Sequence, residues 1–169
     1  FNNDFKAPNF LKVPEPLIQK QFSRIMSLKD GNKKMSKSDP SNLSRINLTD
    51  EKDEIANKIK KAKTDPLPIP ESVKDLMKRP EAENLLSIYS SLKNQNLENS
   101  IKEFERKNFS IFKEKLSDLL IEKIEPISKE IKKLLNDEKY LDTILLEGSN
   151  KADKIASKKI KEIRQLIGF

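Results

Sequence analysis

Apolar side chains recur at helical spacing through most of the chain after residue 49. The longest run begins near Ser110, which can cap it, and extends to Leu135. Its apolar members lie three or four residues apart, as on one face of a helix: Phe112, Leu116, Leu119, Leu120, Ile124, Ile127, Ile131, Leu134 and Leu135. Pro126 lies inside the run, where it removes a backbone donor, so we expect a kink rather than two independent helices. The pattern predicts the spine of a helical bundle.

Two shorter amphipathic segments precede this run. Thr49 or Asp50 is the expected N-cap of the first, whose acidic first turn complements the helix dipole. A proline-punctuated linker over residues 64–70 separates it from a helix that starts at Pro80. The expected apolar positions of the two helices are Ile55, Ile59 and Ala62, then Leu85, Leu86, Ile88, Tyr89 and Leu92.

The last segment is helical on both sides of an interruption at Gly148–Ser149. We interpret Glu147–Gly148 as a helix end, with Gly148 in the left-handed conformation. Beyond it, one face is apolar and the opposite face is basic. The basic positions are Lys151, Lys154, Lys158, Lys161 and Arg164.

The first 48 residues follow a different pattern. Three prolines among residues 1–16 predict a loop. Residues 23–28 alternate polar and apolar side chains and run into a turn at 29–32, which fits a short strand. We expect no hairpin partner downstream, because residues 33–39 are polar and Pro40 lacks a ladder donor. The strand would then need partners from elsewhere.

Composition removes several kinds of chemistry. The 169 residues contain no Cys and no His, which excludes disulfides, thiolate nucleophiles, imidazole bases and Cys/His metal sites. The net charge of +7 makes a polyanionic partner plausible, although lysines also simply solvate helix faces. No apolar run approaches the ~20 residues of a membrane span, so we expect a cytoplasmic protein that does not associate with a membrane. Because the chain starts at Phe1, we treat it as a fragment.

The segment with the clearest chemistry is Lys34-Met35-Ser36-Lys37-Ser38. It is not a Walker A loop, because a single glycine precedes it. It offers two lysines three residues apart and two hydroxyls on a turn, which can close over a triphosphate. A cation that binds the departing pyrophosphate better than ATP in its ground state would accelerate adenylyl transfer. The alternative is an ordinary solvated polar loop.

The flanking sequence resembles that of the tryptophanyl-tRNA synthetases, a class I family. The similar blocks follow the family's order and spacing over nearly the whole chain: residues 24–28, 33–40, 58–59, 62–65, 84–89, 147–148, 151–152 and 155–156. The resemblance implies a mainly α fold, with a helical bundle of the anticodon-binding type preceded by the tail of an α/β Rossmann-type catalytic domain. It divides the chain into residues 1–45, with the ATP loop, and residues 46–169, which bind tRNA.

The resemblance also implies site residues and partners. Lys34, Met35, Ser36, Lys37 and Ser38 would bind ATP, with Lys34 and Lys37 catalytic on the triphosphate and Mg²⁺ arriving with ATP. The intact enzyme would be a homodimer that activates L-tryptophan and transfers it to tRNA(Trp). The family's His-containing nucleotide motif is missing from this His-free chain. We therefore expect the fragment to be inactive alone.

Other features remain open between two interpretations. Phe104, Phe109, Phe112 and Tyr89 either stack on anticodon bases or pack in the core, and the periodicity favours the core for Phe112 and Tyr89. The basic clusters at residues 58–63 and 151–161 either contact RNA or keep the bundle soluble. Asp39 and Asp65, each before a proline, are expected to be turn residues. The whole-chain alternatives are a free-standing basic helical RNA-binding module and another class I synthetase, such as a tyrosyl enzyme.

Overall fold

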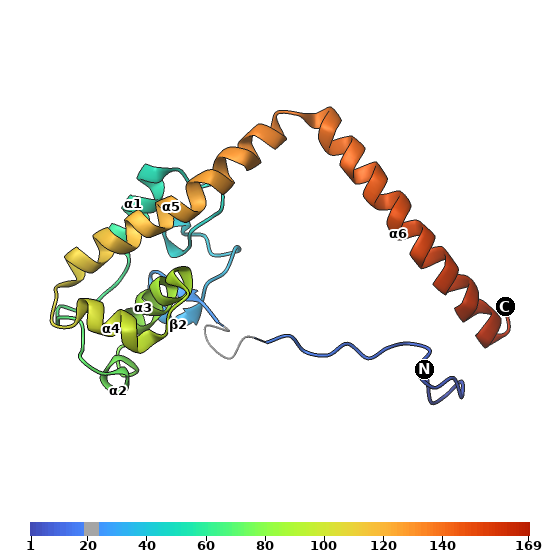
Figure 1. Cartoon of the computed structure of the whole chain (residues 1–169), viewed down its shortest axis with the longest axis horizontal. Helices are drawn as coiled ribbons and strands as arrows, with labels where there is room; N and C mark the ends of the chain where they lie inside the picture. The colour runs from blue at the N-terminus through green and yellow to red at the C-terminus, as the bar shows by residue number, and fades with distance from the viewer. Residues whose placement is uncertain (19–23) are drawn as a thin grey trace. The chain divides into compact units, whose positions relative to one another are not determined.

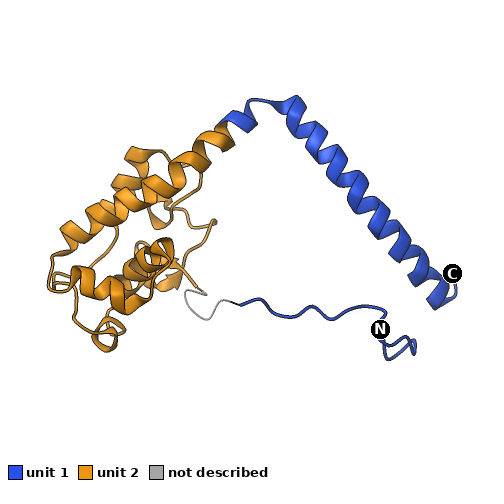
Figure 2. Ribbon diagram, in the orientation of Figure 1, with its two compact units in different colours: residues 1–18, 133–169 blue, residues 19–132 orange. Residues whose placement is uncertain are grey.

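The computed structural model describes residues 1–18 and 24–169 and divides into two compact units (Figures 1 and 2). Unit 2, residues 19–132, contains the core, and unit 1 comprises residues 1–18 and 133–169. The elements in chain order are β1 (Met26–Ser27), β2 (Asp30–Lys34), the 3-10 helix η1 (Asn42–Ser44), α1 (Lys52–Lys61), α2 (Val73–Leu76), α3 (Pro80–Lys93), α4 (Leu97–Phe104), α5 (Phe109–Leu135) and α6 (Glu138–Ile167). The predicted mainly α fold is confirmed.

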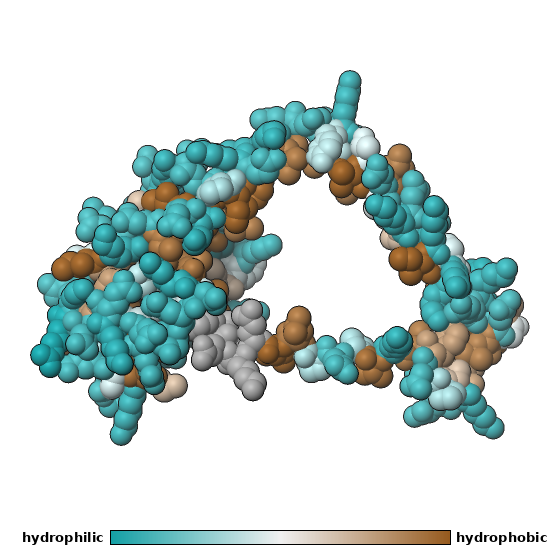
Figure 3. All heavy atoms as spheres, in the orientation of Figure 1, coloured by the Kyte–Doolittle hydropathy of each residue, from teal (hydrophilic) through white to brown (hydrophobic). Residues whose placement is uncertain are grey.

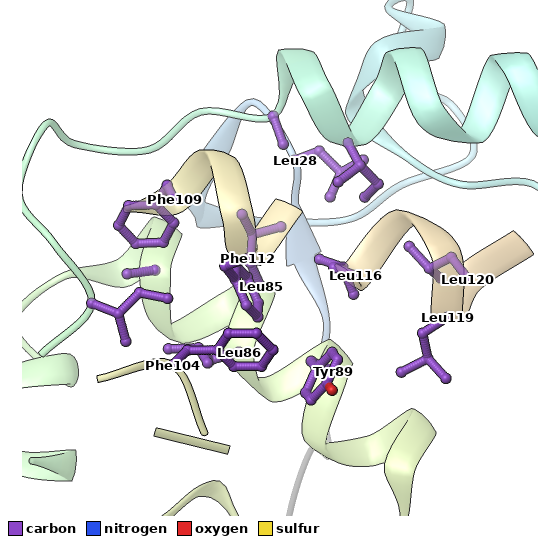
Figure 4. Packing of buried hydrophobic residues seen from close by; sticks show 14 of the residues in the cluster. Leu28, Leu85, Leu86, Tyr89, Phe104, Phe109, Phe112, Leu116, Leu119 and Leu120 are labelled. Carbon is purple, nitrogen blue, oxygen red and sulfur yellow. The ribbon is translucent and has the colours of Figure 1, made fainter. Parts of the chain in front are cut away.

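An aromatic cluster forms part of the hydrophobic core of unit 2 (Figure 4). The Tyr89 and Phe104 rings meet edge to face at 5.1 Å, and Phe112 lies 5.0 Å from Phe104. All three are at most 2% exposed, and Phe109 is 7% exposed. Edge-to-face rings add stabilisation beyond the burial of their area. The packing interpretation is therefore confirmed for these aromatic side chains.

Helix α5 is continuous through Pro126, which confirms one helix rather than two. Its apolar stripe is buried only as far as Ile124, however, and Ile127 and Leu135 are 44% and 60% exposed. The first half of α5 contacts the end of α1: Lys113 Nζ donates to the carbonyl of Ala62, the residue that follows α1, at 2.6 Å. The predicted spine is therefore a core element over its first half.

Three predicted helix boundaries are wrong. Ser110 does not cap α5, because the helix already begins at Phe109. The N-cap of α1 is Glu51, which exchanges hydrogen bonds with Glu54 in a capping box, so neither Thr49 nor Asp50 caps it. Gly148 lies in the interior of α6, where the helix continues without a break. The left-handed C-cap of α6 is Gly168, with φ +89°. A single glycine costs a helix only about 1 kcal/mol, too little to end one this long.

Helix α6 differs from the helices of unit 2 in that it buries no residue. Apolar side chains are exposed along it among charged ones (Figure 3), including Leu145 at 68% and Ile155 at 74%. Among the described residues, no helix combines the length and apolar character that crossing a membrane requires.

The expectation that the short strand lacks a downstream partner is wrong. Strands β1 and β2 form an antiparallel hairpin, with Met26 opposite Lys34 and an irregularity in register beside Ser27. Strand pairing uses only backbone N–H and C=O groups. The polar side chains of Asn32, Lys33 and Lys34 are exposed to solvent, so they do not prevent the pairing. Ser23, the expected first residue of the strand, lies outside the described residues.

Candidate functional site

The predicted ATP loop is an exposed turn at the end of β2. Lys34 is the last residue of the strand, and Ser36, Lys37 and Ser38 are exposed. Met35 is half-buried and packs against the hydrophobic core. The turn therefore displays two ammonium groups and two hydroxyls while one apolar side chain anchors it.

The two serines bond each other within the turn. Their hydroxyl oxygens lie 2.9 Å apart, and the Ser38 N–H donates to Ser36 Oγ at 3.2 Å. The Asp39 N–H donates to the Ser36 carbonyl at 3.4 Å. These local bonds close the turn and aim its polar groups at solvent, where a phosphate chain has access to them.

The N-terminal side of the loop is seated on helix α3. The Met35 N–H donates to the Ile25 carbonyl at 3.1 Å across the hairpin. A Cβ on Gly31 would lie 2.5 Å from Pro80 C and from Glu81 N, so only glycine allows β2 to approach the start of α3 this closely. Lys63 pairs with Glu81 at 2.8 Å beside this contact. The hydrogen bond from Lys63 lowers the pKa of the Glu81 carboxyl, which keeps the pair ionised.

The C-terminal side is held by a chain of polar contacts that begins at Asp39. The Asp39 carboxylate accepts from the Ser41 N–H at 2.8 Å, which confirms it as a turn residue. Arg45 Nη1 donates to the Asp39 carbonyl at 2.9 Å, and Arg45 Nε donates to Asn47 Oδ1 at 3.2 Å. Asn47 in turn donates to the Asp50 carboxylate through its backbone N–H, at 2.8 Å, and through Nδ2, at 3.0 Å.

This chain of contacts ends in a buried ion pair. Lys58 Nζ lies 2.5 Å from Asp50 Oδ2, and the two side chains are 2% and 4% exposed. Burial opposes ionisation of Asp50, but the hydrogen bonds from Lys58 and Asn47 outweigh it, and the pKa of Asp50 lies below its ordinary value. Lys58 was one candidate for RNA contact, and its burial removes it from that role. Lys60, Lys61 and Lys63 are exposed.

The other residues singled out by the sequence are the basic residues of the last helix and Asp65. Lys151, Lys154, Lys158, Lys161 and Arg164 are exposed on α6. Asp65 accepts from the Leu67 N–H at 2.9 Å, as expected of a turn residue, and also pairs with Arg79 at 2.5 Å. A groove of about 690 Å³ between α1 and α5 is lined by Ala56, Lys60, Lys113 and Ile121 among others, and none of its lining residues belongs to the loop. Within the described residues, no three acidic side chains group to hold a metal ion.

Sequence reasoning missed two side chains that bond the backbone on either side of the loop: Arg45, which donates to the Asp39 carbonyl, and Asn84, which bonds the Met26 backbone of β1. Asn84 carried a usable signal: it shares the face of Ile88 and Leu92, at steps of four residues, and is polar where the face is otherwise apolar. Arg45 carried none, because its partners are mainly backbone carbonyls and a nearby amide.

Comparison with known proteins agrees with the sequence blocks. Residues 1–127 match the family model described as tRNA synthetases class I (W and Y). The chain is 46% identical over 169 residues to the tryptophan–tRNA ligase of Caulobacter vibrioides, covering 100% of this chain and 49% of the relative. It is 48% identical over 160 residues to that of Mesorhizobium japonicum, covering 95% and 45%.

The structural comparison agrees on the fold. A tryptophanyl-tRNA synthetase from Mycoplasma pneumoniae matches with a TM-score of 0.82 and 24% identity, over 99% of this chain and 49% of that one. The chain thus spans about half the length of the relatives it matches. The family match runs through the loop and across 127 of the 169 residues, which disfavours an unrelated RNA-binding module. The chain belongs to the family of class I tRNA synthetases that act on tryptophan and tyrosine.

Proposed function

We propose that this chain is the C-terminal half of a tryptophan–tRNA ligase and supplies its ATP loop and its tRNA-binding helices. The observation that carries the proposal is an exposed turn with Lys34 and Lys37, which is held on one side by the packing of Met35 and Gly31 against the helical core and on the other by the bond from Arg45 to the Asp39 carbonyl. Identities of 43–48% to curated tryptophan–tRNA ligases favour tryptophan over tyrosine as the substrate.

In the proposed reaction, an oxygen of the tryptophan carboxylate attacks the α-phosphorus of ATP. The bond from that phosphorus to the bridging oxygen breaks, and pyrophosphate departs with the electron pair. Lys34 and Lys37 bind the phosphates and tighten on the departing pyrophosphate, where negative charge accumulates. Mg²⁺ accompanies ATP as part of the substrate. A ribose hydroxyl at the 3′ end of tRNA(Trp) then attacks the carbonyl carbon of the adenylate, the bond from that carbon to the phosphate oxygen breaks, and AMP leaves with the electron pair.

The test is tryptophan-dependent ATP–pyrophosphate exchange by the full-length enzyme that carries this chain. We expect Lys37→Ala to reduce turnover about 10²–10³-fold, the usual effect of removing one preorganised donor, with little change in the KM for tryptophan. Lys33→Ala, a neighbouring lysine that pairs with Asp30 at 3.5 Å, is the matched control and should retain most turnover. Equal turnover in wild type and Lys37→Ala would refute a catalytic loop.

Four further parts of the proposal have their own tests. The 169-residue chain alone should show no exchange, since the tryptophan pocket would lie outside it. Tyrosine should not replace tryptophan in the exchange assay. Light scattering of the full-length enzyme should give the mass of a homodimer. Residues 46–169 should bind tRNA with an affinity that falls as salt rises, because lysines near phosphates release counterions.

A further inference from the structure

The side chain of Asn84 makes two close hydrogen bonds to the backbone of a single residue of β1. The Met26 N–H donates to Asn84 Oδ1 at 2.9 Å, and Asn84 Nδ2 donates to the Met26 carbonyl at 2.8 Å. Asn84 lies on α3, 58 residues along the chain, and is only 5% exposed. Its amide therefore pairs with β1 as a neighbouring strand would.

Met26 is also the residue opposite Lys34, where the ATP loop begins. The hairpin is short, its register is irregular beside Ser27, and the side chains of Asn32, Lys33 and Lys34 are exposed. Register is weakly specified in a strand with little buried side chain, and a slip of one residue reverses the direction of every side chain. Something other than the side chains of β2 must fix the direction of Lys34.

We propose that Asn84 is a positioning residue for the ATP loop, which fixes the hairpin register by clamping Met26 to α3. This inference rests on the proposed function of the loop. A primary amide both donates and accepts, as the Met26 backbone requires, whereas a carboxylate can only accept. Asn84→Asp therefore keeps the size of the side chain, loses the bond to the Met26 carbonyl and places a charge against it.

The experiment measures pyrophosphate exchange by the full-length enzyme with Asn84→Asp, Lys34→Ala and both together, beside Lys37→Ala alone. We expect Asn84→Asp alone to lower kcat about 100-fold, the loss that a displacement of about 1 Å causes in a catalytic group, with the KM for tryptophan unchanged. In the Lys34→Ala background, the same substitution should lower kcat less than about threefold, because the lysine that Asn84 positions is then already missing and residues that act through one another are non-additive.

Ser90→Ala is the matched control. Ser90 lies on the same helix and is fully buried, and its hydroxyl bonds the Leu86 carbonyl at 2.8 Å and the Ser100 hydroxyl at 2.6 Å, both on helices of the core. It should lower the melting temperature and leave kcat within about twofold of wild type. Hydrogen exchange of a peptide spanning residues 24–35 supplies a readout independent of catalysis, and it should accelerate in Asn84→Asp but not in Ser90→Ala.

The outcomes separate the two proposals. If Lys37→Ala loses turnover while Asn84→Asp retains it, the positioning role is wrong and the proposed loop function stands. Equal fold losses from Asn84→Asp in both backgrounds, or unchanged exchange in the hairpin peptide, would also reject positioning. If Lys37→Ala retains turnover, the loop function is wrong and the positioning role falls with it.

Discussion

The β1–β2 hairpin, which leads into the proposed ATP loop, and the helical core are each stabilised by a different kind of contact. The core packs apolar side chains such as Phe112 and Leu116, each fully buried. The hairpin buries few side chains and is held mainly through its backbone, by Asn84 and by the close approach of Gly31 to α3. Apolar packing tolerates small shifts, whereas a hydrogen bond or a glycine contact fixes one geometry. The region proposed to bind ATP is thus the one that depends mainly on directional contacts.

Removing an aromatic ring from the core should have the largest effect on stability. Phe112 is fully buried and contacts Tyr89, Phe104 and Phe109. Phe112→Ala should cost about 3–5 kcal/mol of unfolding free energy, measured by chemical denaturation of the chain. The neighbouring Ile111, 47% exposed, is the control, and Ile111→Ala should cost about 0.5 kcal/mol or less. Similar losses in the two variants would contradict a core centred on Phe112.

Breaking the buried ion pair should have the next largest effect. Lys58→Met would leave the Asp50 carboxylate buried without its cation and should cost about 3 kcal/mol. Lys60→Met, on the exposed face of α1, should cost little. The pair also predicts a pH dependence. Because the folded pKa of Asp50 lies below its ordinary 3.8, its contribution is present above that pH and is lost as the pH falls through the folded value.

Measuring the unfolding free energy as the pH is lowered tests whether the Asp50 contribution is lost in acid. The stability difference between wild type and Asp50→Asn should be constant from pH 7 to about pH 5 and should shrink below pH 3.8. Using the difference between the two proteins removes the contributions of other carboxyls, including Asp65 and Glu81, whose pKa values are also lowered. A difference that grows on acidification would mean that Asp50 is protonated in the folded chain.

Gly31→Ala tests the hairpin side of the comparison. The added methyl would lie 2.5 Å from Pro80 and Glu81 backbone atoms, so β2 must move off α3. Overpacking of this kind costs about 1–3 kcal/mol, and we expect exchange activity to fall by more than the stability loss alone explains. Gly148→Ala is the control for glycine replacement itself. Unchanged activity in Gly31→Ala would show that the hairpin adapts, as the core does.

The smallest expected effect is a gain. Gly148 lies inside α6, and nothing lies within 4 Å of a Cβ built on it. Gly148→Ala should therefore stabilise α6 by about 0.5–1 kcal/mol, seen as increased helicity by circular dichroism. Gly168→Ala should give no gain, because its φ of +89° suits glycine alone. A loss of helicity in Gly148→Ala would instead support the prediction that a helix ends at Gly148.

Apolar periodicity identified the parts of the chain that pack through apolar side chains. It correctly identified Ile55, Ile59 and Leu86 as buried, along with the start of α3 at Pro80. It could not identify the hairpin, because the pairing of Met26 with Lys34 depends on backbone bonds and on a side chain 58 residues away. The loop residues were proposed from their chemistry, but the contacts around them were not predicted. Arg45 bonds backbone carbonyls, which no pattern marks, and Asn84 stood out only as a polar residue on an otherwise apolar helix face.

The bond between Ser36 and Ser38 has a consequence for selectivity. The two hydroxyl oxygens lie 2.9 Å apart, so one hydroxyl donates its proton to the other and only one proton is free for a ligand. A phosphate oxygen that takes the donated proton exchanges one hydrogen bond for another, which releases little free energy, so the proposed ATP loop would owe most of its affinity to the charges of Lys34 and Lys37. Such a loop should discriminate by the number of charges a ligand carries, and a neutral hydroxyl compound should bind it weakly.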